Sequence, residues 1–392
     1  MVNVQRIYVG GWFQRTTLHL SEIYDFLKEA QSPLDLDKNE LFRFRESLDC
    51  EEIIWVAAGL EYIQVVTTQG IKIKIFEDGL IVLGKEGEGR KVEDEIRTLT
   101  EYYEKRLSPA ISYIFSLGAP VPKELANIKT IYPYFLVLQK AREPEIQNLL
   151  QSFGQERTFT IKKKEFSICR GDKLYIINNI AEKPETIEAF IEEQIFLREF
   201  KGQMHRYLNL HRSIWERIAN VKEKGTIRGE EINLFYAKIQ SYAKTINLID
   251  GRINQMGSYI RTRATIAKSN LAMEKFKDVL QFKYETMEDT LAYIKELWKM
   301  TKNYVDSAQN LFASIQAKST EASVKNLTII TSMGVGATLI GLFSQKIPEF
   351  TLFGVGYFFT LAIIGYLANE VMKRMSQRRM YKINDAEIAK DL

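Results

Sequence analysis

Two charge-free runs mark the pattern of hydrophobic and polar positions near the C-terminal end. Residues 326–345 and residues 350–369 each contain 20 positions without Asp, Glu, Lys or Arg, and the sequence KIPE separates them. At about 1.5 Å of rise per residue, a helix of this length spans a hydrocarbon core of roughly 30 Å. A pair of buried core helices is the alternative, but such helices usually carry charges on one face. The pattern therefore predicts a transmembrane hairpin.

The predicted hairpin divides the end of the chain into four segments. The first span covers residues 326–345, the outer turn 346–349, the second span 350–370 and a basic tail 371–392. Basic residues follow the second span at once, whereas the turn has only Lys346. By the positive-inside rule, both long ends face the cytoplasm and the turn faces outward. We expect a multi-pass protein of the cell membrane, without a signal peptide because no apolar core follows a basic start.

Helical periodicity fills the middle of the chain. Residues 186–268 predict two long antiparallel helices, and residues 269–325 a stalk helix that enters the first span. If the stalk and span are continuous from 270 to 345, the helix has about 76 residues and is roughly 114 Å long. A seven-residue register places Leu280, Met287, Ile294, Ala308, Ile315 and Ala322 on one face, with Leu297, Tyr304 and Leu311 three positions on. This spacing is typical of a coiled coil, or of a helix that packs only on its own chain.

The first 185 residues alternate between strand and helix signals. Residues 4–13 predict a strand and residues 21–30 a helix with Ser21 as its cap. Gly70 and the Asp78-Gly79 pair predict hairpin turns, and a second β-α-β-β unit turns near Gly171. The fold class is therefore an α+β cytoplasmic domain, 1–185, followed by long helices, a coiled-coil stalk and a C-terminal two-helix transmembrane hairpin.

Composition excludes several functions. With 54 Lys and Arg against 50 Asp and Glu, the net charge of +4 does not indicate a nucleic-acid binder. His205 and His211 are six residues apart and do not share a helix face as a metal pair would. The glycine-rich GKEGEGR, 84–90, lacks the ending of a phosphate loop, and we find no nucleophile with a base or cofactor fingerprint. We therefore expect neither an enzyme nor a covalent cofactor.

The region around the first span resembles the CorA-type magnesium transporter superfamily. VKNLTII, 324–330, is similar to that family's entry into the pore helix, and IPEF, 347–350, to its outer loop. The resemblance covers about 185–385 by architecture and 315–375 by motif. It implies a homo-oligomer, a pentamer in this family, that lies in the lipid bilayer and transports divalent cations, with Mg²⁺ as substrate and regulator.

One departure from the family is clear. The family has Gly-Met-Asn at the outer end of the first span, where the asparagine ring holds a hydrated cation, and GLFSQK stands in that place here. Ser344 and Gln345 are polar enough to contact hydration water. Lys346 puts a positive charge at the outer mouth, which repels divalent cations unless Glu349 pairs with it. CorA-like proteins without this motif include nucleotide-gated defence effectors.

The predicted sites follow from spacing and from the resemblance. Thr331, Thr338 and Gln345 recur every seven residues on one helix face, although threonines in spans also bond their own helix carbonyls. The predicted pore-lining residues are Val324, Leu327, Thr331, Thr338, Ser344 and Gln345. By resemblance, the carboxylates Glu285, Glu288, Asp289 and Glu321 are candidates for a regulatory metal site, and a solvated helix face is the alternative.

Two functions remain open from the sequence. The first is a CorA-like homo-oligomeric channel or transporter for divalent metal cations, which conducts along residues 326–345 and is gated by the cytoplasmic domain. The second is a CorA-like membrane-anchored signalling protein, ligand-gated effector or scaffold that does not transport Mg²⁺. The missing Gly-Met-Asn and Lys346 favour the second function, and the absence of a recognisable nucleotide loop gives it no support.

Overall fold

The structure is a computed structural model with two compact units. It describes residues 4–13, 19–57, 59–87, 91–115, 133–222 and 225–343, and scattered positions between 359 and 382. Unit 1 comprises Met1–Asn209 and Leu248–Glu296, and unit 2 comprises Leu210–Asn247 and Leu297–Leu392. Three long helices contribute to both units: α7 (Pro184–Lys222), α8 (Gly229–Ser269) and α9 (Lys277–Phe343).

A nine-stranded mixed sheet forms the centre of unit 1, with the strand order β2-β3-β4-β5-β1-β6-β9-β8-β7. Neighbouring strands are antiparallel except β6 and β9, which are parallel. The strands are β1 (Val4–Trp12), β2 (Cys50–Val56), β3 (Tyr62–Thr67), β4 (Lys72–Phe76), β5 (Leu80–Glu86), β6 (Tyr134–Gln139), β7 (Phe159–Lys162), β8 (Phe166–Arg170) and β9 (Leu174–Asn179).

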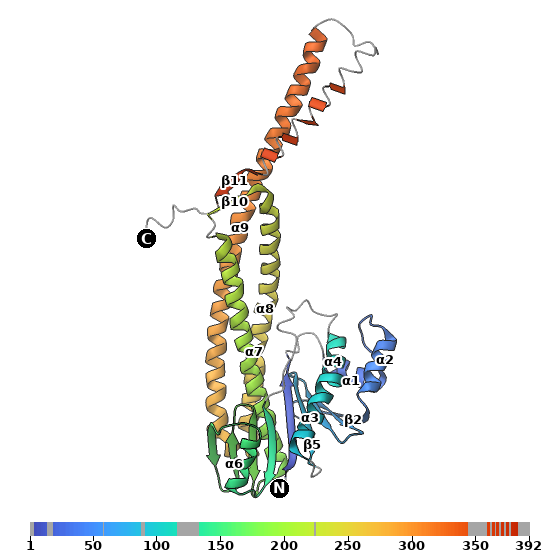
Figure 1. Ribbon diagram of the computed structural model, residues 1–392, viewed down its shortest axis with the longest axis vertical. Coiled ribbons are helices and arrows are strands. Elements are labelled where there is room, and N and C mark those ends of the chain that lie inside the picture. The colour runs from blue at the N-terminus through green and yellow to red at the C-terminus, as the bar shows by residue number, and fades with distance from the viewer. Residues whose placement is uncertain are drawn as a thin grey trace, which may run out of the picture. The chain divides into compact units, whose positions relative to one another are not determined.

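Both faces of the sheet are covered by helices. On one face, Ile7 and Val9 share a hydrophobic core with residues of the shorter helices. On the other, the Trp12 ring lies 5.2 Å from Phe200 of α7. Successive side chains of β1 point to opposite faces of the sheet, so this strand contributes to the hydrophobic core on each face. The shorter helices, of which α1 to α4 are grouped beside the sheet in Figure 1, are α1 (Leu20–Glu29), α2 (Lys38–Ser47), α3 (Val92–Tyr102), the π-helical η1 (Tyr103–Leu107), α4 (Ser108–Phe115) and α6 (Glu143–Ser152).

The predicted elements of the first 185 residues agree well with the observed ones. Turns at Gly70 and at Asp78-Gly79 join β3 to β4 and β4 to β5. The cap of α1 is corrected: the helix begins one residue earlier than expected, and His19 precedes it, donating its backbone N–H to Glu22 at 2.6 Å. The predicted β-α-β-β segment has three strands after α6 rather than two, because residues 163–165 form a further turn between β7 and β8.

The long helices confirm the helical middle of the chain, with one correction to the register. Residues at the first heptad position, Leu280, Met287, Ile294, Ala308 and Ile315, are buried, as is the interrupting Thr301. The second buried row lies four positions on rather than three, at Leu291, Trp298, Val305 and Phe312. A short 3₁₀ helix, η2 (Leu271–Phe276), precedes α9, so the third helix begins later than Asn270.

The heptad face of α9 is buried by its own chain. In unit 2, the Trp215 ring of α7 stacks on Tyr304 with centroids 4.4 Å apart, and Phe235 of α8 lies 6.3 Å from Phe312. Thr301 donates its hydroxyl to the Leu297 carbonyl at 2.9 Å, which satisfies this buried polar group. The periodic stripe up to Ile315 is therefore explained by contacts within one chain.

A two-stranded sheet in unit 2 joins residues far apart in the sequence. β10 (Thr226–Arg228) lies in the connection between α7 and α8, and it pairs antiparallel with β11 (Met380–Lys382), as Figure 1 shows. Gly229 also donates its N–H to the Arg379 carbonyl at 3.0 Å. The basic tail after the second charge-free run is thus attached to the start of α8.

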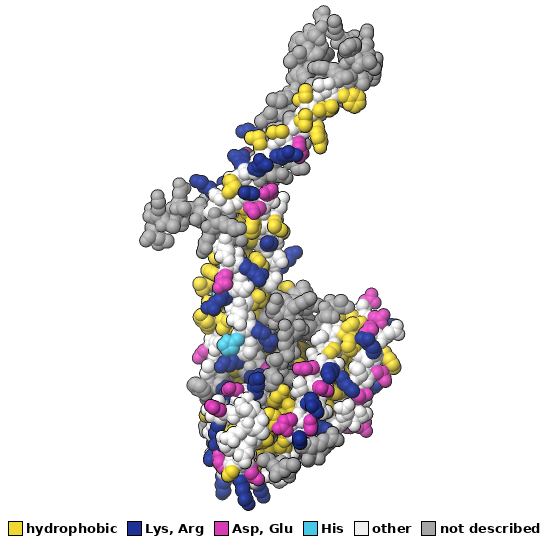
Figure 2. Space-filling view, in the orientation of Figure 1, with side chains coloured by type: hydrophobic (Ala, Val, Ile, Leu, Met, Phe, Trp, Pro, Cys, Tyr) yellow, Lys and Arg dark blue, Asp and Glu magenta, His cyan; other side chains and the backbone are white. Residues whose placement is uncertain are grey.

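The end of the chain contains many exposed hydrophobic side chains. More than half of the side-chain surface is exposed at Val335, Phe359, Ile363, Ile364, Tyr366, Leu367, Val371 and Met375. Figure 2 shows hydrophobic side chains gathered on this segment, with Lys and Arg side chains beside them. Such a concentration of exposed hydrophobic groups is uncommon on a soluble monomer surface.

Among the residues that the structure describes, no helix combines the length and apolar composition needed to cross a bilayer.

Gly79 makes a close approach that only glycine permits. Its φ is +92°, and a Cβ at this position would lie 1.9 Å from the Phe13 carbonyl oxygen. Gly70 has a φ of +71° and no atom within 4 Å of such a Cβ. Gly79→Ala should therefore reduce the free energy of unfolding by about 1–3 kcal/mol or more. Gly70→Ala, which adds backbone strain alone, should cost roughly 1 kcal/mol.

Urea unfolding of the purified full chain, followed by tryptophan fluorescence, measures both values. Equal losses in the two variants would show that contact with Phe13 is not the cause.

Candidate functional site

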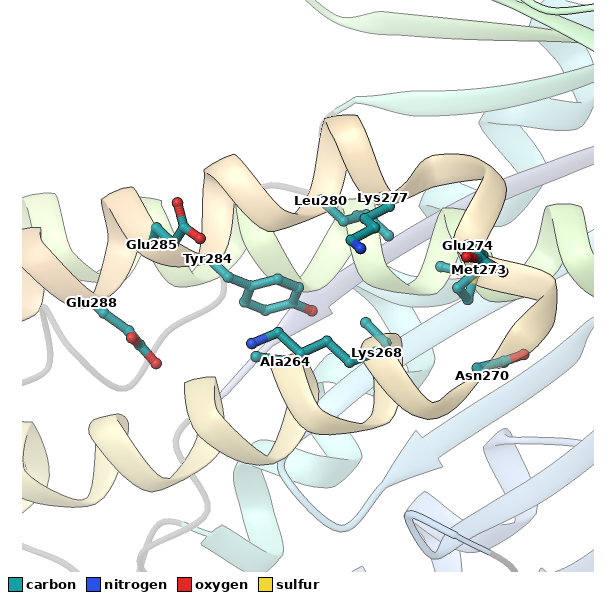
Figure 3. A pocket seen from close by; sticks show the side chains of 11 residues that line it. Ala264, Lys268, Asn270, Met273, Glu274, Lys277, Leu280, Tyr284, Glu285 and Glu288 are labelled. Carbon is teal, nitrogen blue, oxygen red and sulfur yellow. The ribbon is translucent and has the colours of Figure 1, made fainter.

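A pocket of about 470 Å³ lies in unit 1 where α8 ends and α9 begins. Figure 3 shows its side chains coming from the last turns of α8, from η2 and from the first turns of α9. The lining residues are Ala264, Ala267, Lys268, Asn270, Met273, Glu274, Lys277, Leu280, Tyr284, Glu285 and Glu288. The volume is in the range of small-molecule sites.

The pocket has an apolar floor and a charged rim. Met273, Leu280 and Tyr284 are buried, whereas the two lysines and three glutamates of the lining are exposed. The rim thus offers both ammonium donors and carboxylate acceptors around a hydrophobic base. This combination is suited to a small ligand with an apolar body and charged or polar groups.

Tyr284 connects the pocket to a buried ion network. Its hydroxyl donates a hydrogen bond to the Glu193 carboxylate, and Glu193 accepts a second bond from Arg263 Nη1 at 3.1 Å. Arg263 then binds Asp78 in a bidentate manner, with Nε to Oδ2 at 2.6 Å and Nη2 to Oδ1 at 3.1 Å. Four elements meet here: the β4–β5 turn, α7, α8 and α9.

The electrostatics of this network keep Arg263 charged and Tyr284 protonated. Burial disfavours the Arg263 guanidinium, but Asp78 and Glu193 outweigh burial and raise its pKa. Burial, followed by the charge of Glu193, raises the pKa of Tyr284. Burial also raises the pKa of Glu193, against the pull of Arg263. A tyrosine in this state acts as a hydrogen-bond donor that positions α9, not as a base or a nucleophile.

A second charge cluster lies on the same face of the sheet. Lys74 of β4 bridges two glutamates of α7, with Nζ 2.6 Å from Glu188 and 2.7 Å from Glu192. Burial opposes the charge of Lys74, but the two carboxylates raise its pKa. These bonds, together with Arg263, fix the helices to the sheet through buried and partly buried ions.

The structure separates the predicted metal ligands. Glu285 and Glu288 line the pocket rim, Asp289 is exposed on α9 outside the lining, and Glu321 lies in the part of α9 assigned to unit 2. Within the described ranges, no three His, Cys, Asp or Glu side chains are grouped to hold a metal ion. The regulatory site stays a prediction for the assembled protein.

The predicted pore residues fall mostly outside the description. Val324 and Thr331 are exposed on α9. Leu327 and Thr338 belong to the same helix, but their side chains lie outside the described residues. The outer mouth also lies outside them: Ser344, Gln345, Lys346 and Glu349.

Sequence reasoning missed the Arg263 network. Asp78 is predicted only as a turn residue, and neither Arg263 nor Tyr284 has a role predicted from the sequence. Arg263 and Asp78 are 185 residues apart. The available signal is the basic and polar segment RTRAT, 261–265, on a helix whose other face is apolar. This segment does not identify the partner of Arg263.

Removing Arg263 should destabilise the protein strongly. Arg263→Met leaves Asp78 and Glu193 buried without their counter-charge, so we expect a loss of about 3–5 kcal/mol in the free energy of unfolding. The control Arg97→Met removes an exposed pair with Asp94 and should change the value by less than about 1 kcal/mol.

The loss in Arg263→Met should depend on pH. Burial already raises the pKa of the Glu193 carboxyl, and loss of the guanidinium removes the charge that opposes this rise, so stability relative to the parent falls as pH increases from about 4 to 7. Urea unfolding at several pH values measures this slope. A loss that does not change with pH would indicate lost packing rather than lost charge.

The chain is distant from known proteins. No family model matches it, and no curated protein matches it. Among solved structures it is similar to the soluble domain of CorA from Methanocaldococcus jannaschii, with 9% sequence identity and a TM-score of 0.19, over 48% of this chain and 92% of that chain.

Proposed function

We propose that the chain is a CorA-like homo-oligomeric membrane protein of the cell membrane that conducts divalent cations, Mg²⁺ among them, along residues 326–345. Both termini face the cytoplasm, and unit 1 controls conduction through α9. The assembly is a symmetric ring of several copies, because a single two-helix hairpin encloses no pathway, and five is the number that the CorA resemblance implies. The proposal concerns transport without enzymatic activity and without a covalent cofactor.

The pairing of β10 with β11 is the observation that carries this proposal. Gln316 of α9 donates to Asn233, in an early turn of α8, at 3.2 Å. α9 continues for 27 more residues to Phe343, or about 40 Å. The chain then returns by Met380 to the start of α8. The chain therefore leaves the level of α8 along α9 and comes back to it at β11. This path supports a hairpin long enough to cross a bilayer core.

Two further features support the membrane location. The hydrophobic side chains exposed between Val335 and Met375 are suited to contact with lipid tails. Arg374 and Arg378 lie at the end of this segment and are also exposed. They are close in sequence to Met380, where the chain rejoins α8. Basic residues at that level are those expected on the cytoplasmic side.

Control by unit 1 is supported by the continuity of α9. This helix extends without a break from Lys277, at the pocket, to Phe343, in the first charge-free run. Tyr284 ties its first turns to the Arg263 network. A ligand that alters the pocket therefore acts on the same helix that enters the proposed pathway.

Reconstitution into liposomes loaded with a magnesium-sensitive dye tests transport. Thr338→Val should change the uptake rate several-fold, because the hydroxyl is proposed to touch the hydration shell of the cation. Ser332→Ala is the control, because it removes a hydroxyl from the same helix roughly 100° around from the face of Thr331 and Thr338. Both variants should form the same oligomer by size-exclusion chromatography with light scattering.

An unchanged rate in Thr338→Val would exclude this pathway. No uptake by oligomeric parent protein would favour the second function, a ligand-gated effector without Mg²⁺ transport. Lys346 at the proposed outer mouth is the observation that favours it. A thermal-shift comparison separates the two: stabilisation by divalent ions supports the transporter, and stabilisation by nucleotides alone supports the effector.

A further inference from the structure

Lys283 of α9 is a largely buried ammonium without a carboxylate partner. Its Nζ donates to Gln194 Oε1 of α7 at 2.5 Å. Within the described part of the chain, no carboxylate oxygen lies within 4.0 Å of this nitrogen. Buried charges in proteins are normally paired, so this lysine calls for an explanation.

The groups around Lys283 are also positive. Burial is the main cause that lowers the pKa of Lys283 to about 8, and the charges of Arg170, at the end of β8, and of Lys201 of α7 lower it further. Arg198, which shares a stripe of α7 with Gln194 and Lys201, is affected by Arg170 as well. Among the described residues, the carboxylate of Glu199 lies beside this group, 4.0 Å from Arg198.

Gln194 supplies an unused donor at the same place. The residue is 4% exposed, and its Nε2 has no hydrogen-bond partner. This nitrogen belongs to the same amide group as the oxygen that accepts from Lys283, so the unused donor lies beside the Lys283 ammonium. An unsatisfied buried amide donor costs free energy that an acceptor at this position would recover.

We propose that Lys283, Gln194, Arg170 and Lys201 form a binding site for a phosphate group of a small soluble compound. Phosphate has several acceptor oxygens and a double negative charge, which suits an amide donor, two ammonium groups and a guanidinium. Because Gln194 is almost completely buried, an oxygen that reaches its amide nitrogen has to belong to a small group. The site is separate from the pocket, whose lining does not include these four residues.

Inorganic phosphate is the probe for the test, and chloride at matched ionic strength is its reference. The parent protein, purified as the full chain, should bind phosphate by isothermal titration calorimetry and show a higher Tm with phosphate than with chloride. Lys283→Gln should weaken phosphate affinity at least tenfold. Lys295→Gln, a partly exposed lysine on the same helix, should stay within twofold of the parent.

Proton uptake provides a second readout. At pH 8.5 most Lys283 side chains are neutral in the free protein, since the pKa is about 8. A bound phosphate favours the ammonium, so binding takes up protons at pH 8.5 but not at pH 7. Titrations in two buffers with different ionisation enthalpies measure this uptake, which Lys283→Gln should abolish.

The behaviour without phosphate distinguishes a binding site from a structural role. Lys283→Gln removes a buried charge that has no counter-ion, so its Tm in phosphate-free buffer should equal or exceed that of the parent. A lower Tm, equal phosphate affinity in Lys283→Gln and Lys295→Gln, or identical shifts with phosphate and chloride would each overturn the proposal. Because binding is measured directly, the result does not depend on whether the protein transports cations.

Discussion

The bidentate pair between Arg263 and Asp78 is the contact on which the arrangement of unit 1 depends. Asp78 belongs to the tight β4–β5 turn, where its carbonyl also accepts a bond from the Trp12 indole at 2.8 Å. Through Glu193 and Tyr284, the same guanidinium reaches α7 and α9. Ions buried this deeply stabilise only when every partner is present, so the network specifies one position for the three helices against the sheet.

Local signals in the sequence were sufficient for most elements but not for this network. The turn at Gly79 and the ends of α8 can be predicted because their signals lie within a few residues of each other in the sequence. The predicted register of α9 was wrong by one position in its second row. Trp298 packs against His211 of α7 and Phe312 against Phe235 of α8, and the heptad pattern does not reveal these contacts. The Asp78–Arg263 pair joins residues 185 positions apart, and no local pattern identifies such partners.

Buried contacts within one chain also change the basis for proposing an oligomer. The heptad stripe up to Ile315 is covered by α7 and α8, so it offers no free surface to a second copy. On α9 the exposed large hydrophobic side chains lie off this stripe, first at Tyr293 and Met300 and then at Val324 and Val335, and more follow in the described residues after 358. Most of these side chains lie in or beside the charge-free runs, so this is the surface that lipid or a neighbouring copy would cover.

Two adjacent pairs attach the first turns of α9 to α7, and they differ in completeness. Tyr284 meets Glu193 in a network whose charges are balanced by Arg263 and Asp78. Lys283 meets Gln194 beside further positive groups, with a donor left over. An anion at the second pair would supply the missing acceptor and counter-charge, while the first pair holds the helix in place. A ligand there would change the strength of the contact between α9 and α7 while the core stays folded. Because α9 continues to Phe343, such a change could be transmitted along this helix.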